Sequence, residues 1–323
     1  MAEYYVDVAV GDDGNLGTSE GAGNAWETLA KAADEVAAGD TVHIKASGDY
    51  IAQDGANDCV LYLSTDGTAG SPITWEGYTS TPGDGGQAII DASDNSLAYS
   101  VNGSAGSFNA FKNLRMTGAS SYGFAYNPID CCYFENCRFD NNGSIGVFVD
   151  NYNIFYRCQA DKNGDAGFFA DNSMFIGCKS FDNTFRGIRN AFAGVILHCI
   201  CYGNGTAQIL VNSINIIVSN CVVDGENSTI GIHQDSVVGY GSLFFNNIIF
   251  DCDTGISCDG DVSPFQIEDY NLFFSNTTDL INITAGANSI SGSEDPFTDS
   301  ASHNYTLKSN SEAEDAGFDM GEF

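Results

Sequence analysis

Two aspartates at equivalent points of a sequence repeat are the first candidates for acid–base chemistry. Asp150 and Asp171 are each followed by Asn, and one repeat separates them. If they stack on adjacent turns, their carboxyl groups lie about 5 Å apart, the separation that retaining glycosidases use. Asp140 and Asp161 form a second pair of this kind, and stacked carboxylates can also bind Ca²⁺. Because the chain has 43 acidic residues, such pairs also arise by coincidence.

Aromatic and basic side chains follow the same repeat and suggest a binding strip. Five residues share one position after the glycine of successive repeats: Phe148, Phe169, Arg189, Ile209 and His233. With Val147 and Phe168 pointing into the core, we expect these five to point outward. Pyranose faces pack on aromatic rings, and carboxylates accept hydrogen bonds from sugar hydroxyls. The predicted substrate-binding residues are Phe148, Phe169, Arg189 and His233, with Asp150 and Asp171 beside them.

A basic residue would serve an elimination reaction instead. Such a reaction needs a base, usually Lys or Arg, and a cation that neutralises the substrate carboxylate. Arg189 clusters with Lys162, Lys179 and Arg186 on neighbouring repeats. It is therefore a candidate catalytic residue, as Asp150 and Asp171 are. The alternative interpretation for all of these residues is ordinary solvated surface, and no catalytic residue is assigned.

Metal and cofactor sites are not predicted. His233 has no partner in the sequence pattern, so a surface imidazole is the alternative to a general acid or a metal ligand. Cys131 and Cys132 are adjacent and do not form the spaced pair of a zinc site. Ca²⁺ is the one ion that the acidic pairs could bind.

The composition restricts the partners. The chain has 323 residues and a formal net charge of −32, from 43 acidic and 11 basic side chains. This charge repels phosphate backbones and anionic lipid, which argues against nucleic acid and membrane surfaces. No apolar run approaches the ~18 residues of a membrane span. Residues 1–6 contain neither a basic leader nor an apolar stretch, so we predict no classical secretory signal. We expect a location on a virion or extracellular surface, or alternatively in the cytoplasm.

A repeat that begins near residue 110 predicts a parallel β-solenoid. A marker position recurs about every 20–27 residues: Leu114, Cys137, Cys158, Cys178, Cys199, Cys221, Ile248 and Leu272. An apolar residue, often Phe, precedes the marker, and Asn and then Gly follow it. In-register parallel strands stack like side chains about 4.8 Å apart. We therefore expect buried Phe and Cys stacks with reduced thiols, and an Asn ladder where the backbone turns through the left-handed region.

The N-terminal region predicts a single amphipathic helix. Residues 24–38 carry apolar side chains at helical spacing, with Asn24 as the cap, Glu27 in a capping box and Gly39 at the end. We therefore predict an all-β fold with an N-terminal α-helical cap at residues 1–50. The parallel β-helix follows at 51–283, and an irregular acidic tail at 284–323.

Short motifs along the chain support this fold. They are Tyr4-Tyr5-Val6-Asp7 and Gly39-Asp40-Thr41-Val42 in the cap, Ser71-Pro72-Ile73-Thr74-Trp75 in the early turns, and Asp295-Pro296-Phe297 with Tyr305-Thr306-Leu307 in the tail. In these motifs the chain resembles the right-handed parallel β-helix superfamily of pectate lyases, alginate lyases, polygalacturonases and phage tailspikes. The resemblance implies the fold, whereas the reaction varies within it. The calcium-binding aspartate cluster of pectate lyases and the Gly-His-Gly of polygalacturonases are not matched.

Strands before the marker are apolar at every position, as in Ile154-Phe155-Tyr156 and Val195-Ile196-Leu197. One outer strand face is therefore apolar, and loops or another subunit must cover it. Because tailspike β-helices bury such faces in trimers, we expect a homotrimer.

Three functions are compatible with the sequence. The first is an oligomeric virion or surface β-helix that contacts glycans without cleaving them. The second is a polysaccharide lyase or glycoside hydrolase, and the third is a purely structural or capsid-decorating protein. The apolar strip and the poor match to any catalytic motif favour the first.

Overall fold

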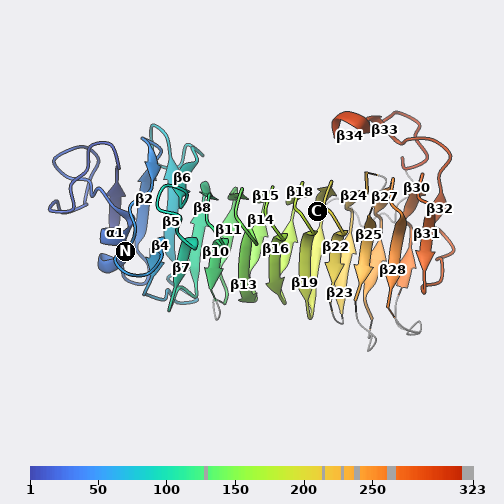
Figure 1. The fold of residues 1–323 in the computed structure, drawn as a ribbon, viewed down its shortest axis with the longest axis horizontal. Coiled ribbons are helices and arrows are strands. Elements are labelled where there is room, and N and C mark those ends of the chain that lie inside the picture. Colours follow the sequence, from blue (N-terminus) through green and yellow to red (C-terminus); the bar gives the residue numbers. More distant parts are fainter. Residues whose placement is uncertain (127–129, 213–214, 227–228, 236–240, 260–266, 315–323) are drawn as a thin grey trace. The chain divides into compact units, whose positions relative to one another are not determined.

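Three parallel β-sheets, called A, B and C, run through each of two units of the chain. The computed structural model describes residues 1–126, 130–212, 215–226, 229–235, 241–259 and 267–314. The units are Met1–Met174 and Phe175–Phe323. In each of them, one strand from every sheet makes one turn of a right-handed parallel β-helix, as the sequence predicted (Figure 1).

The first unit contributes strands to all three sheets. In order of pairing, sheet A has β1 (Glu3–Val6), β2 (Thr41–Lys45), β5 (Ile73–Tyr78), β8 (Asn109–Lys112), β11 (Tyr133–Glu135) and β14 (Ile154–Tyr156). Sheet B has β3 (Asp49–Tyr50), β6 (Ala88–Asp91), β9 (Leu114–Thr117), β12 (Arg138–Asp140) and β15 (Gln159–Asp161). Sheet C has β4 (Cys59–Leu63), β7 (Tyr99–Gly103), β10 (Tyr122–Tyr126), β13 (Val147–Asn151) and β16 (Ala166–Asp171). Paired strands therefore begin inside residues 1–50.

The second unit repeats this arrangement and adds a hairpin. Sheet A has β20 (Gly194–Leu197), β23 (Ile216–Ser219), β26 (Leu243–Phe245) and β29 (Ile267–Asp269), and β17 (Met174–Ile176) lies at the boundary of the units. Sheet B has β18 (Lys179–Phe181), β21 (Ile200–Tyr202), β24 (Val222–Asp224), β27 (Ile248–Phe250), β30 (Leu272–Phe274) and β32 (Ile290–Ser291). Sheet C has β19 (Arg186–Ala191), β22 (Ala207–Val211), β25 (Ile230–Gln234), β28 (Thr254–Cys258) and β31 (Thr278–Ile281). The C-terminal hairpin comprises antiparallel β33 (Phe297–Asp299) and β34 (Asn304–Leu307), joined through the 3₁₀ turn η1 (Ser300–Ser302).

The N-terminal helix is shorter than the sequence predicted. Helix α1 spans Leu29–Glu35, and its cap is Thr28, whose hydroxyl accepts a hydrogen bond from the first turn at 3.2 Å. The predicted start at Asn24 is wrong because the preceding backbone is held by another segment. The carboxylate of Asp13 accepts hydrogen bonds from the N–H and the hydroxyl of Thr28, at 2.9 and 2.7 Å. The helix also ends before the predicted Gly39.

The Phe and Cys columns are buried in the core, which confirms the repeat. In the first unit, Phe111, Phe134 and Phe155 stack with ring centroids 5.2 and 4.7 Å apart. The five predicted stack cysteines are at most 1% exposed: Cys137, Cys158, Cys178, Cys199 and Cys221. All eleven cysteines are free thiols. Their sulfurs contact backbone carbonyls, as Cys158 Sγ does with the Phe134 oxygen at 3.4 Å.

An asparagine ladder lines one corner of each unit, as predicted, but its backbone conformation differs. Asn142 Nδ2 donates to Asn163 Oδ1 at 3.0 Å in the first unit. Asn183 Nδ2 donates to Asn204 Oδ1 at 2.9 Å in the second. The left-handed position is the residue before each ladder member, for example Asn141 with φ of 54°. Asparagine therefore occupies this column for its amide hydrogen bonds and not for its tolerance of positive φ.

Three later positions differ by one residue from the sequence alignment, and one of them is Leu272, whose marker position is taken by Asn271. Strands β24 and β27 pair so that Asn247, and not Ile248, follows Cys221 in the marker column. The Asn247 side chain accepts a hydrogen bond from the Cys221 N–H at 3.0 Å. Phe244 likewise enters the core in place of Phe245. Matching apolar residues to the marker concealed this change from a thiol to an amide.

The outer face of sheet A is apolar at β14 and along the second unit, as predicted, whereas Glu76, Lys112 and Glu135 form a charged column on it earlier in the first unit. Ile154 is 37% exposed in the first unit. In the second unit, one outer column consists of Val195, Ile217, Leu243 and Ile267, and Ile267 is 55% exposed. Within the described ranges, no helix combines the length and apolar character needed to cross a membrane.

Candidate functional site

Four half-buried aromatic side chains form a ladder on sheet C of the first unit. Their ring centroids follow one another at 5.9 Å from Tyr99 to Tyr122, 5.8 Å to Phe148 and 4.8 Å to Phe169. The rings are tilted by 38–53° against their neighbours. Since the four residues come from β7, β10, β13 and β16, the ladder crosses four consecutive strands.

The sequence predicted half of this aromatic ladder. Phe148 and Phe169 are paired in register, as expected from the repeat. The residue paired with Phe148 on β10 is Ala125, so the periodic alignment stops there. Tyr122 lies at the start of β10, and its ring contacts Phe148 diagonally. Because Tyr122 and its partner Tyr99 are out of step with the repeat, the spacing argument missed both.

A β-bulge changes the expected aspartate pair. Strands β13 and β16 shift register after Val149, so that Asn151 and not Asp150 lies opposite Asp171. The predicted stacking of Asp150 on Asp171 is therefore wrong in register. Burial raises the pKa of the Asp150 carboxyl, and the negative charge of Asp130 acts in the same direction. Both aspartates lie on strands of the aromatic ladder, and their catalytic role stays a prediction.

Arg189 and His233 lie on the outer column of sheet C in the second unit. They are separated by Leu210 on β22, because the register pairs Arg189 with Leu210 and Leu210 with His233. Ile209 is fully buried, so its predicted outward position is wrong. His233 Nε2 lies 3.2 Å from Asp259 Oδ1. Contacts of Arg189 and His233 with the aromatic ladder stay a prediction.

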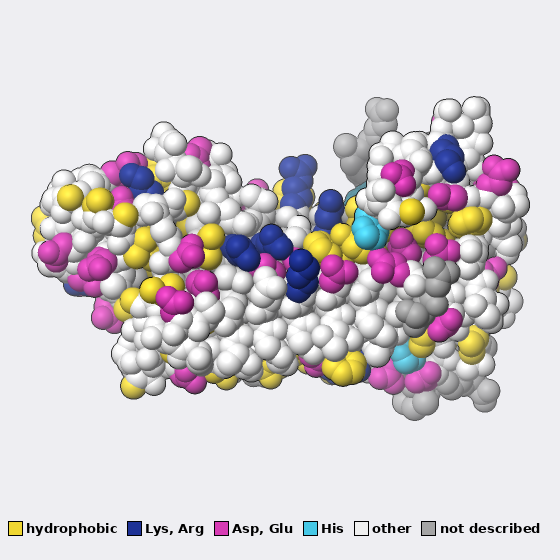
Figure 2. Space-filling model, turned by 45° about the horizontal axis from the view of Figure 1, so that its top comes forward, with side chains coloured by type: hydrophobic (Ala, Val, Ile, Leu, Met, Phe, Trp, Pro, Cys, Tyr) yellow, Lys and Arg dark blue, Asp and Glu magenta, His cyan; other side chains and the backbone are white. Residues whose placement is uncertain are grey.

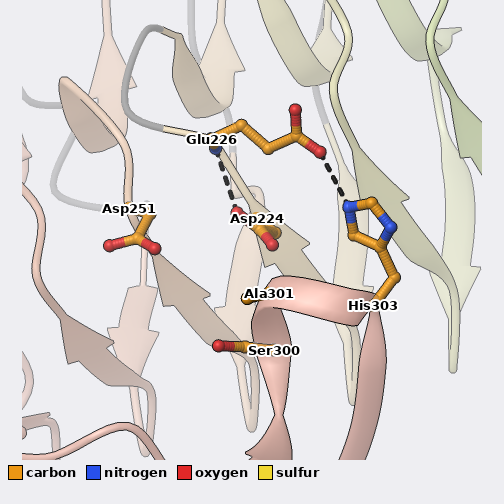
Figure 3. Close-up of a pocket in the computed structure, with 6 residues that line it drawn as sticks. All are labelled: Asp224, Glu226, Asp251, Ser300, Ala301 and His303. Atoms are coloured by element: carbon orange, nitrogen blue, oxygen red, sulfur yellow. Dashed lines mark hydrogen bonds and ion pairs between the residues drawn. The ribbon is translucent and has the colours of Figure 1, made fainter.

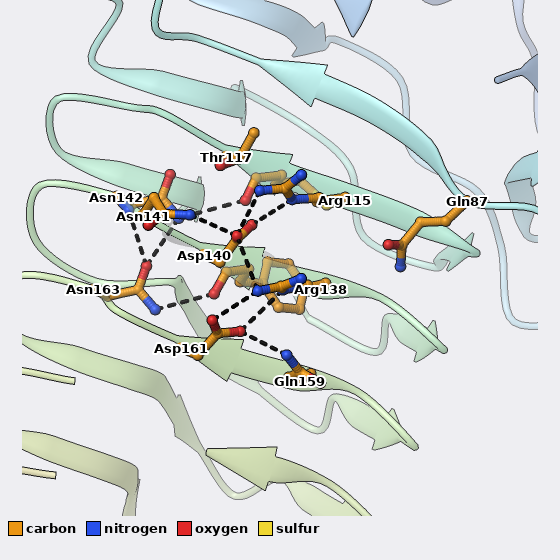
Figure 4. A network of polar contacts seen from close by, with 12 residues as sticks. Gln87, Arg115, Thr117, Arg138, Asp140, Asn141, Asn142, Gln159, Asp161 and Asn163 are labelled. Carbon is orange, nitrogen blue, oxygen red and sulfur yellow. Dashed lines mark hydrogen bonds and ion pairs between the residues drawn. The ribbon is translucent and has the colours of Figure 1, made fainter. Parts of the chain in front are cut away.

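An arginine–aspartate network covers sheet B of the first unit (Figure 4). Arg115 forms two hydrogen bonds of 2.7 Å with Asp140, and Arg138 binds Asp161 at 3.0 and 2.8 Å. Arg138 also lies 3.3 Å from Asp140 and so bridges the two carboxylates. Both aspartates have fully buried side chains. Arginines thus neutralise the second acidic pair, which is a structural ladder here.

Beside this network, the first unit has a pocket of about 500 Å³ that contains both charge signs. Lys112 lies 3.5 Å from Glu135, and Arg157 packs over the ring of Tyr156 at 4.9 Å. Figure 2 shows Lys and Arg side chains gathered on one face among acidic ones. The pocket wall includes the loop at 79–86, where Asp84 accepts four backbone N–H groups. These bonds hold the pKa of Asp84 well below its usual range.

A second pocket, of about 340 Å³, lies in the second unit against the C-terminal hairpin (Figure 3). Its lining combines three carboxylates with residues of η1 and the turn after it: Asp224, Glu226, Asp251, Ser300, Ala301 and His303. The Glu226 N–H donates to Asp224 Oδ1 at 3.0 Å, and the Tyr305 hydroxyl donates to Asp224 Oδ2 at 3.0 Å. The Glu226 carboxylate lies 2.9 Å from His303 Nε2.

The carboxyl groups of this second pocket differ in environment. Asp224 is 4% exposed, and burial raises its pKa to about 6. The hydrogen bonds from Glu226 and Tyr305 lower it, whereas the charges of Asp251 and Glu226 raise it further. Burial and the charge of Asp224 also raise the pKa of the Tyr305 hydroxyl far above its usual value. Asp224 therefore holds a proton at a pH where ordinary aspartates are ionised.

Sequence reasoning missed this pocket. Asp224 and Glu226 follow one repeat, whereas His303 and Tyr305 come from the tail, and no periodic signal joins them. The sequence assigns Tyr305 to a motif of the fold and gives it no role in a site. No group of three or more His, Cys, Asp or Glu side chains that could hold a metal ion occurs in the part of the chain that the structure describes.

Comparison with known proteins identifies the fold. No protein-family model matches the sequence, and no curated protein does. The pectate lyase Pel9A is 18% identical with a TM-score of 0.67, over 97% of this chain and 90% of its own. A rhamnogalacturonan lyase is 18% identical with a TM-score of 0.69, over 92% and 90%. The chain is a right-handed parallel β-helix.

A third β-helix neighbour comes from the glycoside hydrolases. The lacto-N-biosidase of family GH136 from Eubacterium ramulus is 12% identical with a TM-score of 0.56, over 88% of this chain and 67% of its own. At these identities the similarity shows the β-helix fold alone, and the function has to be argued from the sites.

Proposed function

We propose that this protein binds a polysaccharide through the aromatic ladder of its first unit. The observation that carries the proposal is the continuity of Tyr99, Tyr122, Phe148 and Phe169 across four strands, with each ring half-buried. Parallel strands repeat at about 4.8 Å, which is comparable with the length of one pyranose ring. A sugar chain lying along the column would meet one aromatic ring per strand.

The chemistry of the aromatic ladder suits carbohydrate. Aromatic rings pack on the apolar faces of sugars, and neighbouring oxygens bind the hydroxyl groups at the edges. The carboxylates of Asp150 and Asp171 lie on the same strands and supply acceptors. Because the chain carries a net charge of −32, a neutral or cationic glycan is favoured over a polyuronate.

The structural neighbours support a polysaccharide ligand. Three of these neighbours are a pectate lyase, a rhamnogalacturonan lyase and an alginate lyase. Because the fold also occurs with other functions, the aromatic ladder carries the proposal for this chain. Binding without cleavage, on a virion or cell surface, is the form that the sequence favoured. Cleavage is the second candidate, and the carboxylate pocket of the second unit favours it.

A binding assay with matched variants tests the polysaccharide proposal. We expect the native protein to bind a neutral polysaccharide in affinity electrophoresis, and to bind polyuronates less. Phe148→Ala and Phe169→Ala should each weaken binding up to about tenfold, since one ring contact is worth ~0.5–1.5 kcal/mol. Phe185→Ala is the control, because Phe185 is 46% exposed and lies in the second unit. Equal binding by all three variants would refute the proposal.

A further inference from the structure

The pocket under the C-terminal hairpin contains two carboxyl groups in unlike surroundings. Asp224 ends β24 and is almost fully buried, with both oxygens hydrogen-bonded. Asp251 directly follows β27, is half-exposed and lines the same space. Among the described residues, the Asp251 carboxylate has no hydrogen-bond or ion-pair partner. One acid that keeps its proton up to about pH 6 and one free carboxylate are the two groups that glycosidic hydrolysis requires.

We propose that this pocket hydrolyses a glycosidic bond, with Asp224 as the general acid and Asp251 as the base that activates water. Taking a glycan as the substrate rests on the proposed function. The volume of about 340 Å³ lies within the range of small-ligand sites. Figure 3 places the Asp224 and Asp251 side chains on neighbouring strands of one sheet, beside the η1 turn.

The reaction is balanced by these two groups and water. The Asp224 proton passes to the glycosidic oxygen while the bond between that oxygen and the anomeric carbon breaks. The oxygen of a water molecule forms the new bond to the anomeric carbon, and Asp251 takes its proton. The products are a free alcohol and a hemiacetal. Proton exchange with solvent then restores the acid and the base, and no oxidant or reductant is needed.

The surroundings maintain the asymmetry between the two carboxyl groups. Burial is the main cause of the raised pKa of Asp224, and the charges of Asp251 and Glu226 add to it. Glu226 is itself engaged, since its carboxylate lies 2.9 Å from the imidazole of His303. Tyr305 donates its hydroxyl hydrogen to Asp224 and fixes the orientation of that carboxyl. Tyr305 and His303 are thus positioning residues that the hairpin supplies.

An aromatic stack lies beside the pocket and holds His303 in place. Tyr202 on β21 stacks on His303 with centroids 4.0 Å apart and 20° between the planes. Phe181 stacks on the other side of Tyr202 at 4.8 Å and 5°. Both faces of Tyr202 are therefore covered, and the half-exposed edges of Phe181 and Tyr202 are what the stack leaves open.

The alternative is that Asp224 only anchors the hairpin. Two substrates separate this possibility from catalysis. A general acid is needed for a polysaccharide, whose leaving group is a poor one, and much less for a 4-nitrophenyl glycoside, whose leaving group departs as an anion. We expect Asp224→Asn to lower kcat on a neutral polysaccharide by about 10²-fold or more. The loss on the nitrophenyl glycoside of the released sugar should be several-fold smaller.

The remaining variants complete the experiment. Asp251→Asn should lower kcat on both substrates, and Asp253→Asn, which changes an exposed aspartate outside the pocket, should change neither. The native protein should release reducing ends without any product that absorbs at 235 nm.

For the native enzyme, kcat should fall as the pH rises through about 6, because Asp224 loses its proton there. The other titratable groups facing it are Glu226, Asp251, His303 and Tyr305.

Four outcomes would overturn the proposed hydrolysis. They are no hydrolysis of any neutral polysaccharide or nitrophenyl glycoside, a product that absorbs at 235 nm, full activity of Asp224→Asn, and equal losses on both substrates. Phe169→Ala separates this result from the proposed function, because it should weaken polysaccharide binding without changing turnover of the small nitrophenyl glycoside. Hydrolysis with unaltered binding by Phe169→Ala would reject the aromatic ladder and retain the pocket.

Discussion

The hydroxyl of Tyr305 donates a hydrogen bond of 3.0 Å to the carboxylate of Asp224, across 81 residues of chain. This contact ties the C-terminal hairpin to sheet B of the second unit. Phe297 strengthens the attachment, since its ring lies 5.4 Å from Phe250 and 5.2 Å from Tyr305. A buried carboxyl group that would otherwise lack one donor is thereby satisfied by the tail.

Removing that donor should shift the titration of Asp224. In Tyr305→Phe, the hydrogen bond that stabilises the ionised form is lost, so the pKa of Asp224 should rise above about 6. The free energy of unfolding should fall by roughly 1–3 kcal/mol, because a buried acceptor loses its partner. NMR titration of the aspartate carboxyls and urea unfolding measure the two effects. Tyr152→Phe, at a site 65% exposed, is the control, and an unchanged Asp224 pKa would contradict the assignment.

Asp224 should also make stability depend on pH. Its pKa in the folded protein, about 6, lies above the ordinary value of 3.8. The folded state therefore binds the proton more tightly. The stabilisation from this group is complete below about pH 4 and is lost as the pH rises through about 6. Asp224→Asn stays uncharged and should lack this component. As the pH rises from 4 to 7, the native protein should therefore lose unfolding free energy relative to Asp224→Asn, measured in urea. A constant difference would rule the component out.

The arginine–aspartate network gives a prediction for the first unit. Arg138→Met leaves the buried carboxylate of Asp161 without its two guanidinium hydrogen bonds. Breaking one partner of a buried ion pair typically costs ~3–5 kcal/mol, and we expect a loss of that order in chemical denaturation. Lys162→Met is the matched control, because Lys162 is exposed and has no ion pair among the described residues. Equal stability of the two variants would mean that Arg138 is not needed to compensate the buried charge.

The cysteine stack gives a prediction that is independent of function. Cys137, Cys158, Cys178, Cys199 and Cys221 should react with thiol reagents only after denaturation, because they are at most 1% exposed. Cys131, which is half-exposed, should react first and is the internal control. Cys178→Ser should lower stability by roughly 1–3 kcal/mol, since a hydroxyl replaces a buried thiol. Rapid labelling of three or more stack cysteines in the native protein would contradict the register.

The β-helix was predictable from the sequence because stacking imposes one chemistry on each column. Phe134 and Phe155 must match, and so must Asn142 and Asn163, since each member packs on or bonds to the next. The predicted register is wrong where the residue type of a column changes, as at Asn247, and where a bulge inserts a residue, as beside Asp150.

The sequence predicted part of the aromatic ladder but not the pocket under the C-terminal hairpin. Phe148 and Phe169 were found because they lie on the repeat. The contact between Asp224 and Tyr305 was not predicted, because the hairpin packs back onto the sheet and lies outside the sequence repeat. The burial that raises the pKa of Asp224 comes from the same packing.

Assembly is the last prediction, and it concerns the apolar outer face of sheet A. Val195, Ile217, Leu243 and Ile267 form one outward column in the second unit. Exposed apolar columns of this kind are usually covered by another subunit, and we expect a homotrimer that buries them. Ile176 lies on the same outer face, since Phe175 is the residue of β17 that points into the core, and Ile176→Asp should then give monomers or aggregates in sedimentation velocity. Ile281→Asp, at an exposed position of sheet C, should keep the native state. A native protein that sediments as a monomer at micromolar concentration would refute the trimer.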